Sequence, residues 1–303
     1  MIQNKKSNYK IFTPYILLIP SLVFSVGILF YPTIKMVEYS FLNWSFGKAY
    51  ETAEWNGINN YIWIFNSPSS SLYHALYLTI TYTILSVIAE LVIGLIVAVI
   101  LNRNNVLGRS TLLTGFMIPT LLMPVMVGMM WRMYMYPNGI LSYFLRLFGM
   151  NINWYTAEWA LPAVILIEIW QFTPFFIISF VAGLRAIPTE VLDAAVVDGA
   201  SGWSHFFNIS LPYLKPIIVV TVMIRSLWII KSFDVIYTMF TGGPGSATEI
   251  LGLSIYRALF MYRNIGRSAS LSVILAILTL IVTYMFMKFI YRSRESSESS
   301  NSN

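Results

Sequence analysis

The chain has 303 residues, of which 57% are hydrophobic and only 11% are charged, about half of the charged fraction usual in soluble domains. Too few polar side chains remain to cover a soluble domain of this length, so the composition favours an integral membrane protein. The absence of cysteine excludes disulfides and thiolate chemistry, and the presence of only two histidines excludes a His-rich metal site. The formal net charge of +6 is typical of membrane proteins with basic cytoplasmic loops, and nucleic-acid binding is the less favoured interpretation.

Six apolar runs are each long enough to cross a bilayer, which needs about 20 residues. The expected spans are 12–31, 76–101, 112–135, 160–183, 217–240 and 268–290. None alternates as a membrane β-strand would, so the expected fold is an all-α integral membrane protein with six transmembrane helices. The first run could be a signal peptide, but its length and the lack of a clear cleavage site favour an uncleaved span.

The spans define a transmembrane domain at residues 11–291, between an N-terminal tail at 1–10 and a Ser- and Glu-rich tail at 292–303 that we expect to be disordered. Lysine and arginine are more frequent in the two tails and in the loops after the second and fourth spans than on the other side. The loop after the fifth span is basic too and weakens this bias. The majority predicts that both termini lie in the cytoplasm of a cell membrane.

Charged residues inside the expected spans are candidate functional residues, because an ionisable side chain is costly in a bilayer. They are Glu90, Arg132, Glu168, Arg225, Lys231 and Asp234. Three are acidic and three are basic, which favours an internal charge network over exposure to lipid. Lys231 and Asp234 are spaced to meet on one helix face, as an ion pair or as a solute contact. Arg132 lies near the end of its span and is the residue most suited to reach outward to lipid headgroups.

One expected cytoplasmic loop, residues 184–212, does not read as a membrane segment. Pro188 and Thr189 are typical of a helix start, and the glycine-containing stretch 198–202 breaks that helix. A second short helix would carry aromatic residues and end at Leu211-Pro212. Two short helices with exposed aromatics suit a pocket on another protein, whereas an aromatic belt at the membrane surface is an equally weighted alternative.

The motifs Asp193-Ala194-Ala195, Asp198-Gly199-Ala200 and Leu211-Pro212 resemble the EAA loop of binding-protein-dependent ABC importer permeases, with Asp193 in place of the usual Glu. Other segments are similar to that family as well, namely Gly57-Ile58-Asn59-Asn60-Tyr61, Pro137-Asn138-Gly139, Phe233-Asp234 and Thr241-Gly242-Gly243-Pro244. The resemblance covers about residues 11–291. It is strongest to the carbohydrate-importer branch and, within it, to the maltose-type first membrane subunit.

The resemblance implies a type I importer permease fold and a set of partners. These are a second permease subunit, two ATPase subunits that hold ATP and magnesium, and a solute-binding protein outside the cell. No G-x-x-x-x-G-K-[ST] motif occurs in the sequence, so we expect this chain to bind no cofactor and to carry no catalytic residues. The residues expected to couple to the ATPases are Glu190, Asp193, Ala194, Ala195, Asp198, Gly199, Ala200, Trp203, Phe206, Phe207 and Pro212.

By the same resemblance, the residues expected to line a solute cavity are Gln171, Phe172, Phe175, Trp228, Lys231 and Ser232. Aromatic faces and hydrogen-bonding groups together suit a sugar. Disaccharides, oligosaccharides and glycerol-phosphate-type solutes all stay open. A stand-alone secondary transporter or channel, and an intramembrane enzyme, are the alternative functions, but the first needs no docking loop and the second has no supporting motif.

Overall fold

The computed structural model describes residues 9–67, 70–103, 106–200 and 202–301, so the expected N-terminal tail lies largely outside the described residues. The chain divides into two compact units. The first unit comprises the chain up to Ser70 together with Ile255–Ile274, and the second comprises Ser71–Ser254 together with the chain from Leu275 onward.

The elements of the first unit are α1 (Tyr9–Ser25), the π-helical turn η1 (Val26–Phe30), α2 (Tyr31–Ser40), β1 (Leu42–Asn43), the 3₁₀ turn η2 (Tyr50–Thr52), β2 (Glu54–Trp55), α3 (Asn59–Asn66) and the π-helical turn η5 (Arg257–Met261). Those of the second unit are α4 (Leu72–Leu101), α5 (Arg109–Leu121), α6 (Pro124–Met135), α7 (Ile140–Leu147), α8 (Ala160–Arg185), α9 (Thr189–Val197), α10 (Gly202–His205), the π-helical turn η4 (Phe206–Ser210), α11 (Leu211–Ile229) and α12 (Asp234–Phe240). Helices α13 (Leu251–Tyr256) and α14 (Ile265–Asn301) have residues in both units.

In the first unit, α1, η1 and α2 follow one another without a break, and the segment long and apolar enough to cross a membrane is Leu17–Ser40. The expected span 12–31 overlaps this segment, which continues further along the chain to Ser40. Lys35 and Glu38 form an ion pair at 2.7 Å on the same helix face, and this mutual neutralisation lets the helix continue past both charges. The strands β1 and β2 pair antiparallel, with Leu42 opposite Trp55.

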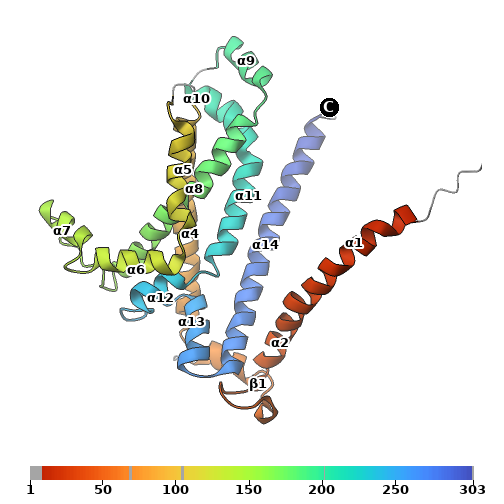
Figure 1. Cartoon of the computed structure of the whole chain (residues 1–303), viewed down its shortest axis with the longest axis vertical. Coiled ribbons are helices and arrows are strands. Elements are labelled where there is room, and N and C mark those ends of the chain that lie inside the picture. Colours follow the sequence, from red (N-terminus) through yellow and green to blue (C-terminus); the bar gives the residue numbers. More distant parts are fainter. Residues whose placement is uncertain (1–8, 68–69, 104–105, 201, 302–303) are drawn as a thin grey trace, which may run out of the picture. The chain divides into compact units, whose positions relative to one another are not determined.

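The second unit is built around the contact between α4 and α8, with α5 and α11 also packed on α8 (Figure 1). Glycines allow close helix contacts at two places. A Cβ at Gly94 of α4 would lie 2.5 Å from the Cβ of Phe176 on α8, and a Cβ at Gly183 of α8 would lie 2.4 Å and 2.7 Å from side-chain atoms of Ile217 and Leu214 on α11. Small residues at such crossings let the backbones of membrane helices approach each other.

Two of the expected spans are not single helices. The run 112–135 forms α5 and α6, which are bent by 91° at the residues between them. Pro124 explains the break, because it has no N–H to donate and it drives Met123 into an extended conformation. The run 217–240 also fails as one helix, since the membrane-length segment is Gly202–Ile229 and α12 is separate.

Among the described residues, five helices are long and apolar enough to cross a membrane, or six if α5 and α6 count as one span. The last of them is Ile265–Ile290 within α14, as the sequence predicts. Helix α14 continues to Asn301, which differs from the disordered tail expected from residue 292. No proline or glycine occurs after Gly266, so nothing in the local sequence ends the helix earlier.

Candidate functional site

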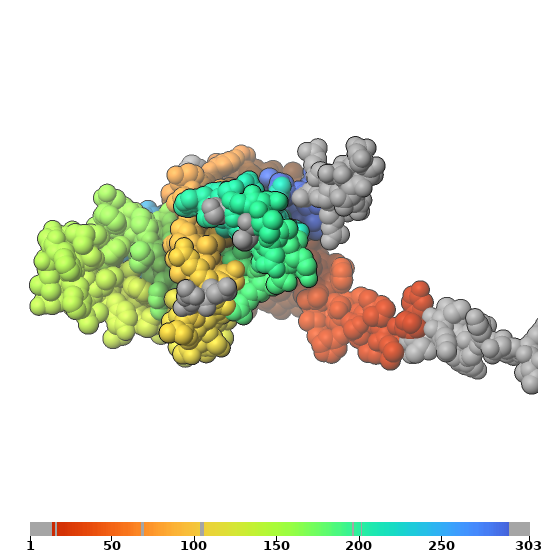
Figure 2. All heavy atoms as spheres, turned by 90° about the horizontal axis from the view of Figure 1, so that it is seen from above, coloured from red at the N-terminus to blue at the C-terminus, as the bar shows by residue number. Residues whose placement is uncertain are grey.

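The loop between α8 and α11 forms the two short helices that the sequence predicts, α9 and α10. They lie at one end of the second unit, beyond the ends of α8 and α11 (Figure 1). Seen from that end, the green helices lie in front of the rest of this unit and are not covered by it (Figure 2). Glu190, Asp193 and Asp198 are exposed, whereas Ala195 is buried.

Gly199 ends α9 in the way that the sequence pattern predicts. Its φ of +78° lies in the left-handed region that favours glycine. The N–H of Asp198 bonds to the carbonyl of Ala194 at 3.0 Å, and the N–H of Ala200 reaches back to the carbonyl of Ala195 at 2.9 Å. The second bond is the signature of a glycine-terminated helix, in which the last free carbonyls are satisfied before the chain turns.

The aromatic residues after the break form an exposed stack. Trp203 is 77% exposed, and its ring lies nearly parallel to that of Phe207, with centroids 5.8 Å apart. Phe206 contacts Phe207 edge to face at 5.2 Å and is half-buried. Phe206 lines a cavity of about 360 Å³ together with Val99 and Arg103 at the end of α4. The loop therefore presents an exposed aromatic edge, and Trp203 and Phe206 also line a cavity beside the end of α4.

The second short helix does not end at Leu211-Pro212. Instead α10, η4 and α11 follow one another from Gly202 to Ile229. Pro212 is exposed and lies in the first turn of α11, where a missing N–H is tolerated. The π-helical turn η4 absorbs the change in hydrogen bonding at this point.

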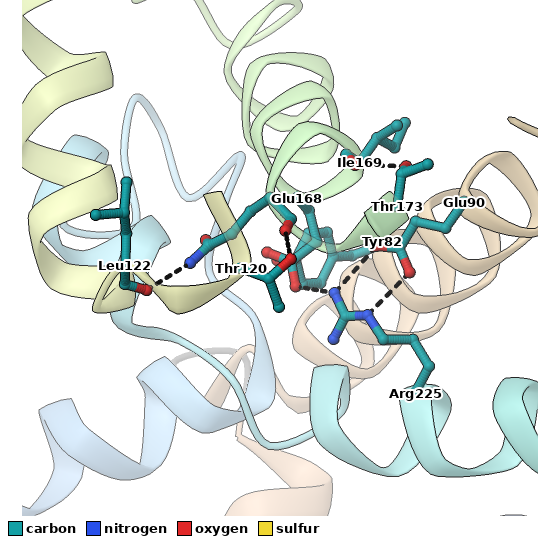
Figure 3. Close-up of polar contacts among 9 residues, drawn as sticks. Tyr82, Glu90, Thr120, Leu122, Glu168, Ile169, Thr173 and Arg225 are labelled. Atoms are coloured by element: carbon teal, nitrogen blue, oxygen red, sulfur yellow. Dashed lines mark hydrogen bonds and ion pairs between the residues drawn. The ribbon is translucent and has the colours of Figure 1, made fainter. Parts of the chain in front are cut away.

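Three of the charged residues picked out in the sequence meet inside the second unit (Figure 3). Arg225 of α11 donates through Nε to Glu90 Oε2 at 2.9 Å and through Nη2 to Glu90 Oε1 at 3.0 Å. The same Nη2 donates to Oε1 of Glu168 on α8. Both glutamates are fully buried and Arg225 is 1% exposed. One guanidinium therefore joins α11 to α4 and α8, and the bonds to Glu90 have the bidentate geometry that favours arginine over lysine.

Tyr82 completes this group, and sequence reasoning missed it. Its hydroxyl donates to Oε2 of Glu168 at 2.7 Å, so all four carboxylate oxygens of the two glutamates accept a hydrogen bond. Tyr82 precedes Glu90 by about two turns on α4, and this spacing on one helix face was the available signal. Phe172 lies against the guanidinium, with Arg225 Cζ 3.9 Å from the ring centroid. We call Tyr82, Glu90, Glu168 and Arg225 the buried charge cluster.

Arg132 and Asp234 do not belong to the buried charge cluster, contrary to the expected network. Arg132 is exposed and its Nη1 donates to the carbonyl of Thr238 at 3.3 Å. Asp234 begins α12, and a carboxylate is favourable at the positive end of a helix. Because α11 has ended at Ile229, Lys231 and Asp234 do not share a helix face, and among the described residues the structure records no ion pair between them.

Gln171 is fully buried and contacts the break between α5 and α6. Its Nε2 donates to the carbonyl of Leu122 at 3.0 Å, and Thr120 Oγ1 donates to the backbone carbonyl of Gln171 at 2.6 Å (Figure 3). Among the described residues Gln171 Oε1 has no hydrogen-bond partner. The residue therefore ties the bent span to α8 through two hydrogen bonds.

The other expected cavity residues lie on α8, on α11 and just after α11. Phe175 and Trp228 are in ring contact at 5.3 Å, and Trp228 is 50% exposed. Lys231 is exposed and Ser232 is half-buried, both in the turn that follows α11. Aromatic rings can bind the apolar faces of a polar solute, and an amine and a hydroxyl can bind its hydroxyl groups. Among the described residues, no three His, Asp or Glu side chains lie close enough to hold a metal ion.

The comparisons with known proteins agree with this arrangement. The family described as "Binding-protein-dependent transport system inner membrane component" matches residues 90–296. The trehalose/maltose transport system permease protein MalF of Thermococcus litoralis is 32% identical over 238 residues, which cover 77% of this chain and 78% of that protein. The inner membrane ABC transporter permease protein YcjO of Escherichia coli is 30% identical over 283 residues, which cover 90% of this chain and 92% of that protein.

The fold has a solved counterpart. A chain in the crystal structure of a bacterial ABC transporter involved in the import of the acidic polysaccharide alginate matches with a TM-score of 0.81 at 22% identity, covering 94% of this chain and 97% of that chain. The resemblance seen in the sequence is thereby confirmed, together with the type I ABC importer permease fold. This chain belongs to the inner membrane component family of binding-protein-dependent transport systems.

Proposed function

We propose that this chain is the membrane-spanning permease subunit of an ATP-driven ABC importer for a sugar or oligosaccharide. It forms half of the translocation pathway together with a second, non-identical permease subunit. Two ATPase subunits bind ATP and magnesium, and their closure moves the helices between two access states. A solute-binding protein outside the cell delivers the solute, and both termini of this chain lie in the cytoplasm.

The observation that carries the proposal is the uncovered segment α9–α10 in a chain without an ATP-binding motif. Trp203 and Phe207 form an exposed, nearly parallel stack at its surface. Exposed aromatic side chains of this kind are enriched at the centres of protein interfaces. The residues of α9 and α10 are therefore the proposed ATPase-coupling site, and they continue through η4 into the spanning helix α11.

The proposed solute class follows from the named relatives and from the side chains of the second unit. One relative is a trehalose/maltose permease, and another, from Agrobacterium fabrum, is the sulfoquinovosyl glycerol permease protein SmoG, 30% identical over 278 residues, which cover 91% of this chain and 89% of that protein. The Phe175–Trp228 pair, with Lys231 and Ser232 three and four residues after Trp228 in the chain, suits the same chemistry. An alginate ABC transporter of this fold is known in complex with an alginate pentasaccharide-bound periplasmic protein, which supports a separate binding protein as partner.

The test is uptake into proteoliposomes that contain this chain with its co-purified permease and ATPase partners. Labelled trehalose, maltose and longer oligosaccharides are offered with the binding protein and with ATP inside or absent. We expect saturable uptake of at least one sugar that requires both ATP and the binding protein. Uptake that proceeds equally without ATP and without ATPase subunits would instead support a stand-alone transporter and contradict the proposal.

A further inference from the structure

We call α9, α10 and the turn between them at Gly199 the coupling segment. The buried charge cluster lies on α4, α8 and α11, and a movement of the coupling segment would be transmitted through α8 and α11. At one end of the segment α9 follows α8, and at the other end α10 continues through η4 into α11. Because a helix rises about 1.5 Å per residue, Arg225 lies roughly 30 Å along α11 from Trp203. A displacement applied to α9 and α10 reaches the far part of the bundle only if α8 and α11 move together over that length.

Attachments of two different kinds join α8 to α11: apolar packing, at Gly183 and in the Phe175–Trp228 ring contact, and the bonds of Arg225. Near the coupling segment, Gly183 lets Leu214 and Ile217 pack closely against α8. Far from it, Arg225 bonds to Glu168. Apolar packing is non-directional, so it resists separation of the helices better than it resists sliding. The charge-assisted bonds of Arg225 are directional, and a slip of one helical residue, about 1.5 Å, breaks them.

The same guanidinium also fixes the third helix. Both oxygens of Glu90 on α4 accept from Arg225, and α4 is packed on α8 at the Gly94–Phe176 crossing. Close apolar crossings thus hold α8 to α4 and to α11, and the buried charge cluster joins all three helices. The guanidinium further covers the ring of Phe172, one turn of α8 away from the Phe175–Trp228 pair.

We propose that Arg225 is a positioning residue that locks α4, α8 and α11 into one rigid unit, so that movement of α9–α10 is transmitted to the solute-facing part of the bundle. The inference rests on the proposed function. It assigns a coupling role to Arg225, whose buried side chain contacts neither the ATPase nor the solute. Lysine keeps the positive charge but cannot hold three carboxylate oxygens on two helices in one plane.

The first test is Arg225→Lys in the complete reconstituted importer, with the number of solute molecules imported per ATP hydrolysed as the measurement. We expect normal assembly and ATP hydrolysis but a fall in this coupling ratio by about tenfold, the size of an ordinary coupling free energy between sites. A role in folding alone would lower the amount of complex without changing the ratio. The matched controls are Arg146→Lys and Glu158→Gln, both exposed and outside the cluster.

A second variant separates positioning from support of the fold. Removing one partner of a buried ion pair leaves an uncompensated charge, whereas replacing all partners by apolar residues is often neutral or stabilising. The quadruple variant Tyr82→Phe, Glu90→Leu, Glu168→Leu, Arg225→Met therefore leaves no member of the cluster unpaired and removes the directional bonds. We expect it to assemble like the wild type and still to show the low coupling ratio.

The outcomes are distinct. A wild-type coupling ratio in Arg225→Lys or in the quadruple variant would overturn the inference. Failure of both to assemble while the two controls do would overturn it as well, because the cluster would then only support the fold. Neither result touches the proposed function, which fails only if the wild-type complex itself shows no ATP-dependent uptake.

Discussion

The side-chain amide of Gln171 donates a hydrogen bond to the backbone carbonyl of Leu122 over 3.0 Å, and through this bond α8 caps the end of α5. The carbonyl belongs to the residue that follows α5, where the chain bends by 91° before α6. Inside a bilayer a free carbonyl at such a break has no water to bond to. A buried polar side chain on the neighbouring helix therefore makes the bent span possible.

The variant Gln171→Leu should destabilise the protein by about 1–3 kcal/mol, because it leaves the Leu122 carbonyl buried without a donor. Thermal unfolding of the purified complex in detergent measures the effect. Gln171→Met should behave similarly, since a thioether has no hydrogen to donate to that carbonyl. The control is Asn138→Leu at an exposed position, which should leave the melting temperature unchanged. Equal stability of Gln171→Leu and the wild type would mean that this bond does not hold the break.

Gly199 and Gly149 form a matched pair for testing the turn after α9. Their φ angles are +78° and +76°, and in both cases nothing lies within 4 Å of an added Cβ. Alanine at either position should therefore cost about 1–2 kcal/mol for the left-handed conformation alone. We expect Gly199→Ala to reduce uptake and Gly149→Ala to leave it unchanged, because only Gly199 lies in the coupling segment.

Gly199→Pro is the stronger form of the same test, since proline fixes φ near −65° and cannot adopt the observed turn. We expect the protein to insert in the membrane and transport to be abolished. Normal uptake by a deletion strain complemented with Gly199→Pro would contradict the assigned role of the turn.

Trp203→Ala should weaken binding of the ATPase subunits. Trp55 provides the control, because it is 72% exposed and stacks on Phe41 at 5.6 Å, much as Trp203 is 77% exposed and stacks on Phe207 at 5.8 Å. The measurement is the amount of ATPase that co-purifies with each variant. Hot-spot aromatic residues lose at least about 2 kcal/mol of binding energy on truncation, so retention should fall by about 30-fold for Trp203→Ala. Equal retention by the two variants would place the docking contact elsewhere.

Trp228→Ala should raise the KM for uptake by about two- to tenfold, the range expected if an aromatic contact contributes about 0.5–1.5 kcal/mol. Lys231→Ala should act in the same direction, because its exposed amine lies just beyond α11. Lys288→Ala, an exposed lysine on α14, is the control. Unchanged KM and selectivity in both Trp228→Ala and Lys231→Ala would show that the solute does not pass this side of the bundle.

The positions of the helices could largely be read from the sequence, because burial in lipid demands long apolar runs and leaves a signal in composition alone. The coupling segment was also predictable in its main features, since Pro188 and Gly199 act on the backbone locally. The effect of a single proline on a helix was harder to predict from the sequence, because the apolar residues around it favour a continuous helix. Pro124 broke an apolar run that composition presents as one span, and Pro212 did not end the helix that it was expected to end.

The sequence by itself determined that Glu90, Glu168 and Arg225 needed partners, because an unpaired charge in a bilayer is too costly to be incidental. It could not determine which residues pair. Arg225 lies 135 residues from Glu90 and 57 residues from Glu168, so only the packing of α4, α8 and α11 brings them together. Asp234, although much nearer to Arg225 in sequence, was removed from the cluster by the end of α11 at Ile229. Composition sets the need for pairing, whereas tertiary contacts between distant helices decide the partners.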